Sequence, residues 1–253
     1  MPRYIFTGRV LPERAVVEIT APKMRIEIPD AKLGFNITIS VHASQIAVIV
    51  ESESDLSDIA TVRNSVDSSV RLLIDAFGYL ECRGYDVEIS SVIEPDGKHT
   101  VFGVEVDVLK SSRVGKNPVG LPELWTLLLA GEDSGPLQNA LGNLREAIKS
   151  PDGTGMYCLR AVESMRQHFV KDGDGDETKA SWDRMSAALK LDESFVSTLK
   201  PFATAQRHGE SPHMSGVQRI EAMKCAWQVV DRYVEYAKRG FEKLPDSEFD
   251  VLM

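Results

Sequence analysis

The chain has 253 residues, of which 43% are hydrophobic and 26% charged. This composition is typical of a globular protein and argues against a disordered or membrane-bound chain. No apolar run reaches the roughly 18 residues that a membrane helix needs, and we expect no membrane partner and no secretory signal. The net charge of −9 argues against a coat for long duplex DNA, because holding many phosphates requires a basic surface.

The three cysteines, Cys82, Cys158 and Cys225, lie far apart, and none belongs to a C-x-x-C pair. An odd number of distant cysteines is not a disulfide framework. We therefore expect reduced thiols in apolar surroundings and a cytoplasmic protein.

The first half of the sequence alternates with a period of two, which is typical of β-strands with one buried face. Short runs rich in Ile and Val predict strands, with Pro, Gly and Asp between several of them. The predicted strands are residues 4–10, 15–19, 24–28, 35–41 and 45–51. The break His42-Ala43-Ser44 predicts a hairpin between the last two.

Residues 57–83 change to a helical period, with an apolar residue at every third or fourth position from Ile59 to Leu80. Asp55 or Ser57 can cap the start of this helix, and Gly84 can end it. Strand patterns return at residues 85–93 and 100–109, joined by a turn that contains Pro95 and Gly97. This half is predicted to be a sheet packed against one long helix.

The second half reads as helical throughout. The predicted helices are residues 123–130, 137–149, 154–171, 179–190, 192–205 and 215–241. Short loops between such helices predict antiparallel packing in a bundle. The predicted fold class is α+β, with a mainly antiparallel sheet domain (residues 1–112), a linker (113–121), an all-α bundle (122–244) and an acidic, loosely ordered tail (245–253).

A polar segment between the last two predicted helices gathers groups that suit phosphate chemistry. It contains Arg207, His208 and His213, and two of the five histidines in the chain thus lie within six positions. An arginine offers paired donors to a phosphate, and a histidine exchanges protons near neutral pH.

The helical half resembles the HEPN superfamily, whose bundles occur in bacterial toxins, defence systems and RNA-processing proteins. The resemblance lies in the helix of residues 157–169, which is similar to the opening core helix of such domains, and in Arg207 followed by His213. The family signature is an Arg, four to six residues and a His, often with a polar residue after the Arg, here His208. Active members commonly have Asn there, and Gly209 and Pro212 interrupt the segment in this chain.

The resemblance implies an RNA-binding protein or a metal-independent endoribonuclease, such as a toxin or a phage-defence effector. His213 would transfer a proton at the attacking 2′-hydroxyl or the leaving oxygen, Arg207 would stabilise the phosphate charge, and His208 would assist. HEPN domains commonly pair two-fold, so the resemblance also implies a homodimer through the helical half. The strand-rich half would then be a sensor or targeting domain.

Other readings of these residues stay open. Arg207 and His208 could cap the end of the preceding helix, where cations are favoured. Glu163 and Arg166, one turn apart, could form an ion pair or support the same cleft as Arg207. The alternative function is a non-catalytic dimerisation or interaction module whose Arg-His turn binds an anionic ligand or a protein partner.

No cofactor or metal site is predicted. The sequence has no zinc-type spacing of Cys and His and no Gly-rich phosphate loop. The run from Asp172 to Asp176 resembles a calcium loop, but the sixth position is Glu177 rather than Gly. A solvated loop is the preferred interpretation.

Overall fold

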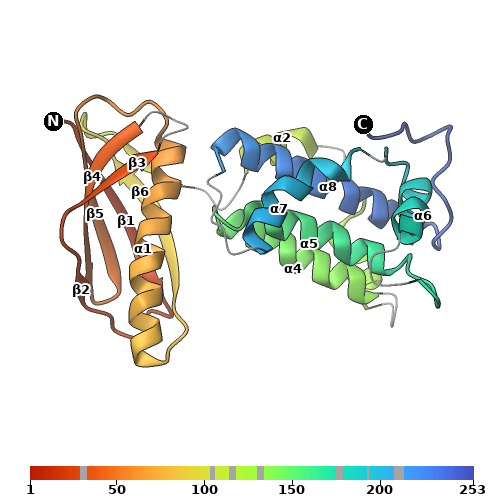
Figure 1. Ribbon diagram of the computed structural model, residues 1–253, viewed down its shortest axis with the longest axis horizontal. Coiled ribbons are helices and arrows are strands. Elements are labelled where there is room, and N and C mark those ends of the chain that lie inside the picture. The colour runs from red at the N-terminus through yellow and green to blue at the C-terminus, as the bar shows by residue number, and fades with distance from the viewer. Residues whose placement is uncertain are drawn as a thin grey trace. The chain divides into compact units, whose positions relative to one another are not determined.

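The computed structural model describes residues 1–28, 33–102, 106–113, 118–129, 134–174, 179–192, 194–207 and 214–253. The chain divides into two compact units, Met1–Val104 and Glu105–Met253. The first is an antiparallel sheet with one long helix and the second is all-helical, which confirms the predicted α+β class (Figure 1). We refer to them as the sheet unit and the helical unit.

All strands of the sheet unit pair antiparallel in the order β2-β4-β5-β1-β6-β7, and β3 also pairs with β4. The strands are β1 (Arg3–Leu11), β2 (Ile19–Thr20), β3 (Met24–Ile28), β4 (Leu33–His42), β5 (Gln45–Ser52), β6 (Asp86–Ile93) and β7 (His99–Val101). Ala43 and Ser44 both have positive φ, as a two-residue hairpin turn between twisted strands requires. The predicted hairpin is therefore confirmed.

Helix α1 (Ile59–Glu81) packs on β6 and β1, and Val62, Val66, Val70 and Ile74 are fully buried there. Its cap differs from the prediction, because the carboxylate of Asp58, rather than Asp55 or Ser57, accepts from Thr61 N at 3.0 Å. The helix ends before Gly84, at Cys82, which adopts the left-handed conformation.

The strand predicted at residues 100–109 is confirmed only at its start, where β7 pairs with β6, and the prediction is wrong from residue 107 onward. Strand β7 stops at Val101, and helix α2 (Asp107–Arg113) begins where the period-two pattern of valines continues. Leu109 is buried in the core of the helical unit. A short apolar run does not distinguish a strand from a helix, and here tertiary packing decides.

The helical unit is built around α5 (Thr154–Gln167), which packs against α4 (Gly135–Lys149), α8 (Gly216–Lys238) and α7 (Lys200–Arg207). The other helices are α3 (Leu121–Leu128), α6 (Lys179–Leu189) and the short 3₁₀ helix η3 (Val196–Leu199). Cys158, Ala161, Val162 and Met165 of α5 are all fully buried. None of the helices among the described residues combines the length and the apolar character needed to cross a membrane.

The end of the chain does not have the loose order predicted for it. Leu252 pairs with Leu191 in a parallel bridge, and Phe249 and Leu252 pack against the helical core. The prediction followed from the acidic composition, but the apolar residues between the acidic ones anchor the segment.

Candidate functional site

The predicted Arg-His segment connects α7 to α8. Helix α7 ends at Arg207. Helix α8 begins with a capping box in which Ser215 Oγ accepts from Gln218 N at 3.3 Å and Gln218 Oε1 accepts from Ser215 N at 2.9 Å. The Arg207 side chain, His208 and His213 lie outside the described residues, so their roles stay predictions.

Both helices that flank this segment pack against α5. Met214, directly before the cap of α8, is buried, as is Ala203 on α7. The two ends of the segment are therefore fixed on one buried scaffold, which is how loops with binding or catalytic roles are commonly held.

A buried cation lies on the first turn of α8, close in sequence to the segment. Arg219 is only 9% exposed, and it donates from Nε to Thr154 Oγ1 at 2.8 Å and from Nη2 to the Ile148 carbonyl at 3.3 Å. These bonds tie the start of α8 to the corner between α4 and α5. Arg219 lies four residues before Met223, on the buried face of α8. A charged residue in register with the apolar stripe of the helix was therefore the feature of the sequence that could have predicted its burial.

The two residues predicted to support the cleft both lie on α5, half-buried. The Arg166 guanidinium faces α6, where Nη1 donates to the buried Ser181 Oγ at 3.0 Å and the group lies 5.4 Å from the Trp182 ring centroid. Arg166 therefore links α5 to α6. The part proposed for Glu163 stays a prediction.

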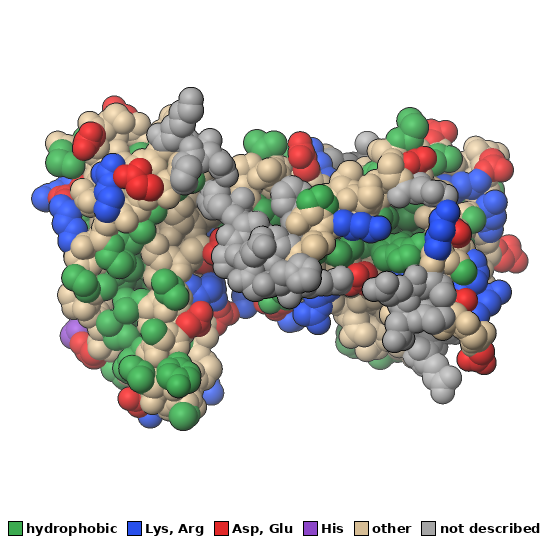
Figure 2. Space-filling view, in the orientation of Figure 1, with side chains coloured by type: hydrophobic (Ala, Val, Ile, Leu, Met, Phe, Trp, Pro, Cys, Tyr) green, Lys and Arg blue, Asp and Glu red, His purple; other side chains and the backbone are tan. Residues whose placement is uncertain are grey.

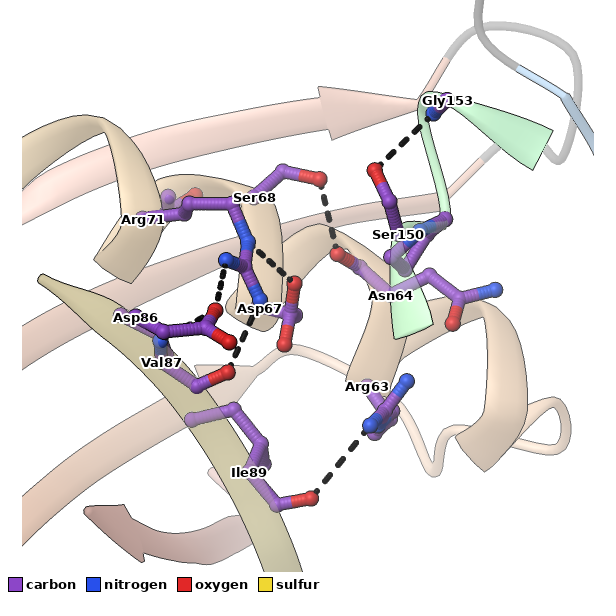
Figure 3. Close-up of polar contacts among 12 residues, drawn as sticks. Arg63, Asn64, Asp67, Ser68, Arg71, Asp86, Val87, Ile89, Ser150 and Gly153 are labelled. Carbon is purple, nitrogen blue, oxygen red and sulfur yellow. Dashed lines mark hydrogen bonds and ion pairs between the residues drawn. The ribbon is translucent and has the colours of Figure 1, made fainter. Parts of the chain in front are cut away.

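A second polar cluster, which the sequence analysis missed, lies between α1 and β6 of the sheet unit (Figure 3). Arg71 donates to Asp67 Oδ2 at 3.2 Å, to Asp86 Oδ1 at 2.6 Å and to the Val87 carbonyl at 2.8 Å. Asp67 is 1% exposed. The i,i+4 spacing of Asp67 and Arg71 beside the apolar stripe was the available signal.

Arg63 extends this cluster towards the start of α1. Its Nη2 lies 3.5 Å from the Ile89 carbonyl, and its guanidinium lies 5.7 Å from the Phe102 ring centroid. Burial lowers the pKa of Arg63. Together the two arginines fasten α1 to carbonyls of β6, and we assign the cluster to the stability of the fold.

The described residues contain no group of three or more His, Cys, Asp or Glu side chains that could hold a metal ion. In the calcium-like run, Asp174 pairs with Arg184 and accepts from Lys171 N at 2.9 Å. The backbone hydrogen bond from Lys171, followed by the bond from Arg184, lowers the pKa of Asp174. The carboxylate of Asp174 therefore bonds to α6 through Arg184.

Two family models match the chain. Residues 4–102 match the N-terminal domain, and residues 121–238 the C-terminal domain, of a family described as "Domain of unknown function (DUF8168)". No curated protein and no solved structure matches the chain. The two models describe consecutive domains of one family and together match most of the chain, so the chain belongs to the DUF8168 family.

Proposed function

We propose that the helical unit binds RNA and cleaves it without a metal ion, at the segment that joins α7 to α8. The observation that supports this proposal most is the central position of α5, which packs against both helices that flank the segment. The helix with the HEPN resemblance thus supports both ends of the segment with the HEPN-like motif. A scaffold of this kind is what a preorganised site needs.

The residue types in the segment are sufficient for the reaction. One histidine takes the proton of the 2′-hydroxyl as its oxygen bonds to phosphorus, and the bond from phosphorus to the 5′ oxygen breaks. The other histidine gives a proton to the departing 5′ oxygen. The products are a 2′,3′-cyclic phosphate and a 5′-hydroxyl, and no oxidant or reductant is required.

In this scheme His213 and His208 exchange the protons, and Arg207 binds the phosphate. A guanidinium stabilises the extra negative charge that develops on the phosphate oxygens in the transition state. The acidic charge of the chain, −9, fits a local site of this kind better than an extended surface for nucleic acid. A two-fold homodimer would bring two such segments to one RNA strand.

The test is RNA cleavage by the purified chain in the presence of EDTA. We expect the Arg207→Ala/His213→Ala variant to cleave mixed RNA at least about 100-fold more slowly than the unmodified chain, as loss of proton transfer and charge stabilisation requires. Lys200→Ala is the matched control, because it removes an exposed positive charge from the same helix, α7. It should keep the full rate.

Equal degradation of RNA by the unmodified chain and the double variant would show that the proposal is wrong. Binding of RNA without cleavage, lost in the double variant, would instead favour the non-catalytic interaction module. Product ends other than a cyclic phosphate and a 5′-hydroxyl would exclude the 2′-hydroxyl mechanism.

A further inference from the structure

The last nine residues, 245–253, form an acidic segment that turns at residues 246–248 and lies against α6 and α8, and we refer to it as the C-terminal segment (Figure 1, dark blue). Its backbone adds to residues 190–192 like an extra strand. Leu252 N donates to the Lys190 carbonyl at 2.9 Å, and Asp192 N donates to the Leu252 carbonyl at 2.8 Å. Pairing of this kind is how many proteins bind an extended peptide.

One aromatic ring anchors the segment. The ring centroid of Phe249 lies 4.8 Å from the guanidinium of Arg232 in α8 and 5.2 Å from that of Arg239 at the end of this helix. Arg232 Nη2 also donates to the Asp250 carbonyl at 2.8 Å. Two cations near one ring make a specific contact, since an aliphatic side chain has no π-face to attract them.

Each of the acidic residues Asp246 and Glu248 meets a cation of the helical unit. Asp246 pairs with Lys190, whose side chain is only 10% exposed, and Glu248 pairs with Arg239. The bond to Glu248 is the main reason that the pKa of Arg239 is raised. Basic and acidic side chains alternate over this end of the unit (Figure 2).

The segment is held at the surface and not within the core. The side chains of Asp246 and Glu248 are 86% and 54% exposed, and exposed ion pairs contribute little to stability. Phe249 and Leu252 are only half-buried. Local opening of such a segment requires far less free energy than opening of the core.

The surface that the segment covers keeps one buried donor group that the segment does not bind. Arg232 Nη1 is buried and has no hydrogen-bond partner among the described residues. Asp183, Ser186, Lys190 and Lys243 line a depression of about 330 Å³, and Val251 of the segment forms part of its wall. The two lysines outnumber the one carboxylate there, which favours an acidic ligand.

We propose that this surface is a recognition site for an acidic peptide with one aromatic anchor, and that the C-terminal segment occupies it as an internal ligand. The partner is a protein segment of the same chemistry, which competes with residues 245–253 for Arg232, Arg239 and Lys190. The proposal is independent of the RNA reaction, because it uses other residues of the helical unit.

The test uses a fluorescent synthetic peptide with the sequence of residues 245–253 and the full-length chain. We expect the Phe249→Ala chain to bind the peptide at least about 10-fold more tightly than the unmodified chain, because an internal ligand lowers the fraction of free sites. A peptide with Ala at the position of Phe249 should not bind. Affinity should fall with added salt, since two of the contacts, Asp246–Lys190 and Glu248–Arg239, pair opposite charges.

The matched control adds Arg232→Ala and Arg239→Ala to the Phe249→Ala chain, and it should lose the peptide. Should Phe249→Ala fail to fold, Asp246→Asn/Glu248→Gln changes only exposed side chains and should also raise the affinity. Equal affinity of the unmodified and the opened chains would overturn the proposal. Dimers that dissociate on addition of the peptide would overturn internal occupancy in favour of exchange between copies.

Discussion

The sheet unit and the helical unit each join their elements through an arginine, but they use it differently. Arg71 of the sheet unit lies between the carboxylates of Asp67 and Asp86 and fastens one helix to one strand. Arg219 of the helical unit donates to a hydroxyl and a carbonyl at the corner where α4, α5 and α8 meet. The first arrangement holds α1 against β6. The second fixes the start of α8, the helix that follows the Arg-His segment.

The difference lies in what each set of buried polar groups holds together. In the sheet unit, the polar groups around Arg71 bond to one another across the helix-sheet contact. In the helical unit, the described residues form a scaffold for a segment rich in phosphate-binding residue types and for a peptide-like tail.

The largest contrast is expected in thiol reactivity. Burial raises the pKa of Cys158 to about 12 and that of Cys225 to about 11, whereas Cys82 of the sheet unit is exposed. A buried thiol with a raised pKa is unreactive, so we expect Cys158 and Cys225 to react at least about 100-fold more slowly than Cys82. Timed labelling at pH 8 followed by mass spectrometry measures this. Rapid labelling of all three thiols would contradict the packing of the helical core.

Loss of Arg71 should destabilise the sheet unit most. Arg71→Met removes the cation that faces the buried Asp67, and we expect the free energy of unfolding to fall by about 3 kcal/mol. The three tryptophans, Trp125, Trp182 and Trp227, all belong to the helical unit. During denaturation of Arg71→Met, circular dichroism should therefore show unfolding at lower denaturant than in the unmodified chain. The transition seen by tryptophan fluorescence should stay where it is.

Two variants control this experiment. Arg83→Met, which removes an exposed cation, should change the free energy of unfolding by less than about 0.5 kcal/mol. Arg71→Met combined with Asp67→Leu should recover part of the loss, because the double variant no longer buries a carboxylate without its cation. An equal shift of the tryptophan transition would show that the two units unfold together.

Loss of Arg219 should have a somewhat smaller effect, confined to the helical unit. Arg219→Met breaks the bonds to Thr154 Oγ1 and the Ile148 carbonyl, and we expect a loss of about 2 kcal/mol. Tryptophan fluorescence during denaturation measures it. Lys224→Met, at an exposed position of the same helix, is the control and should leave the transition unchanged.

The smallest expected effect is the pH dependence of an exposed ion-pair cluster. Bonds from Lys23 and then Arg3 lower the pKa of Glu51 from its usual 4.5. Because the folded pKa is the lower one, the stabilisation is fully present above pH 4.5 and is lost as the pH falls through the folded pKa. The melting temperatures of the unmodified chain and Glu51→Gln should differ slightly at pH 6 and converge at pH 2–3. A difference in melting temperature that grows as the pH falls would contradict a lowered pKa of Glu51.

The fold was largely predictable from local patterns. The alternation in β5 and the apolar stripe of α1 gave the right elements, because burial of one face imposes its period on the sequence. The strand predicted at residues 100–109 failed where a run of valines passes into α2. Leu109 is buried through contacts with residues distant in sequence, which periodicity does not report.

The candidate site was less predictable. Arg219 bonds to Thr154, which lies 65 residues away in the sequence, and Arg71 bonds to Asp86, which lies 15 residues away. Only the fold shows such partners. The acidic tail was predicted to be loose because its composition is charged, yet Phe249 and Leu252 hold it. Arg207, His208 and His213 were selected from their chemistry, and their roles stay predictions.

The most direct test of the central claim, that the helical half carries RNA chemistry at its Arg-His segment, is the initial rate of RNA cleavage in EDTA. We expect a measurable rate for the unmodified chain, a loss of at least about 100-fold for Arg207→Ala/His213→Ala, and an unchanged rate for His99→Ala, an exposed histidine of the sheet unit. The same rate for all three chains, or a rate lost only with His99→Ala, would contradict RNA cleavage at the Arg-His segment.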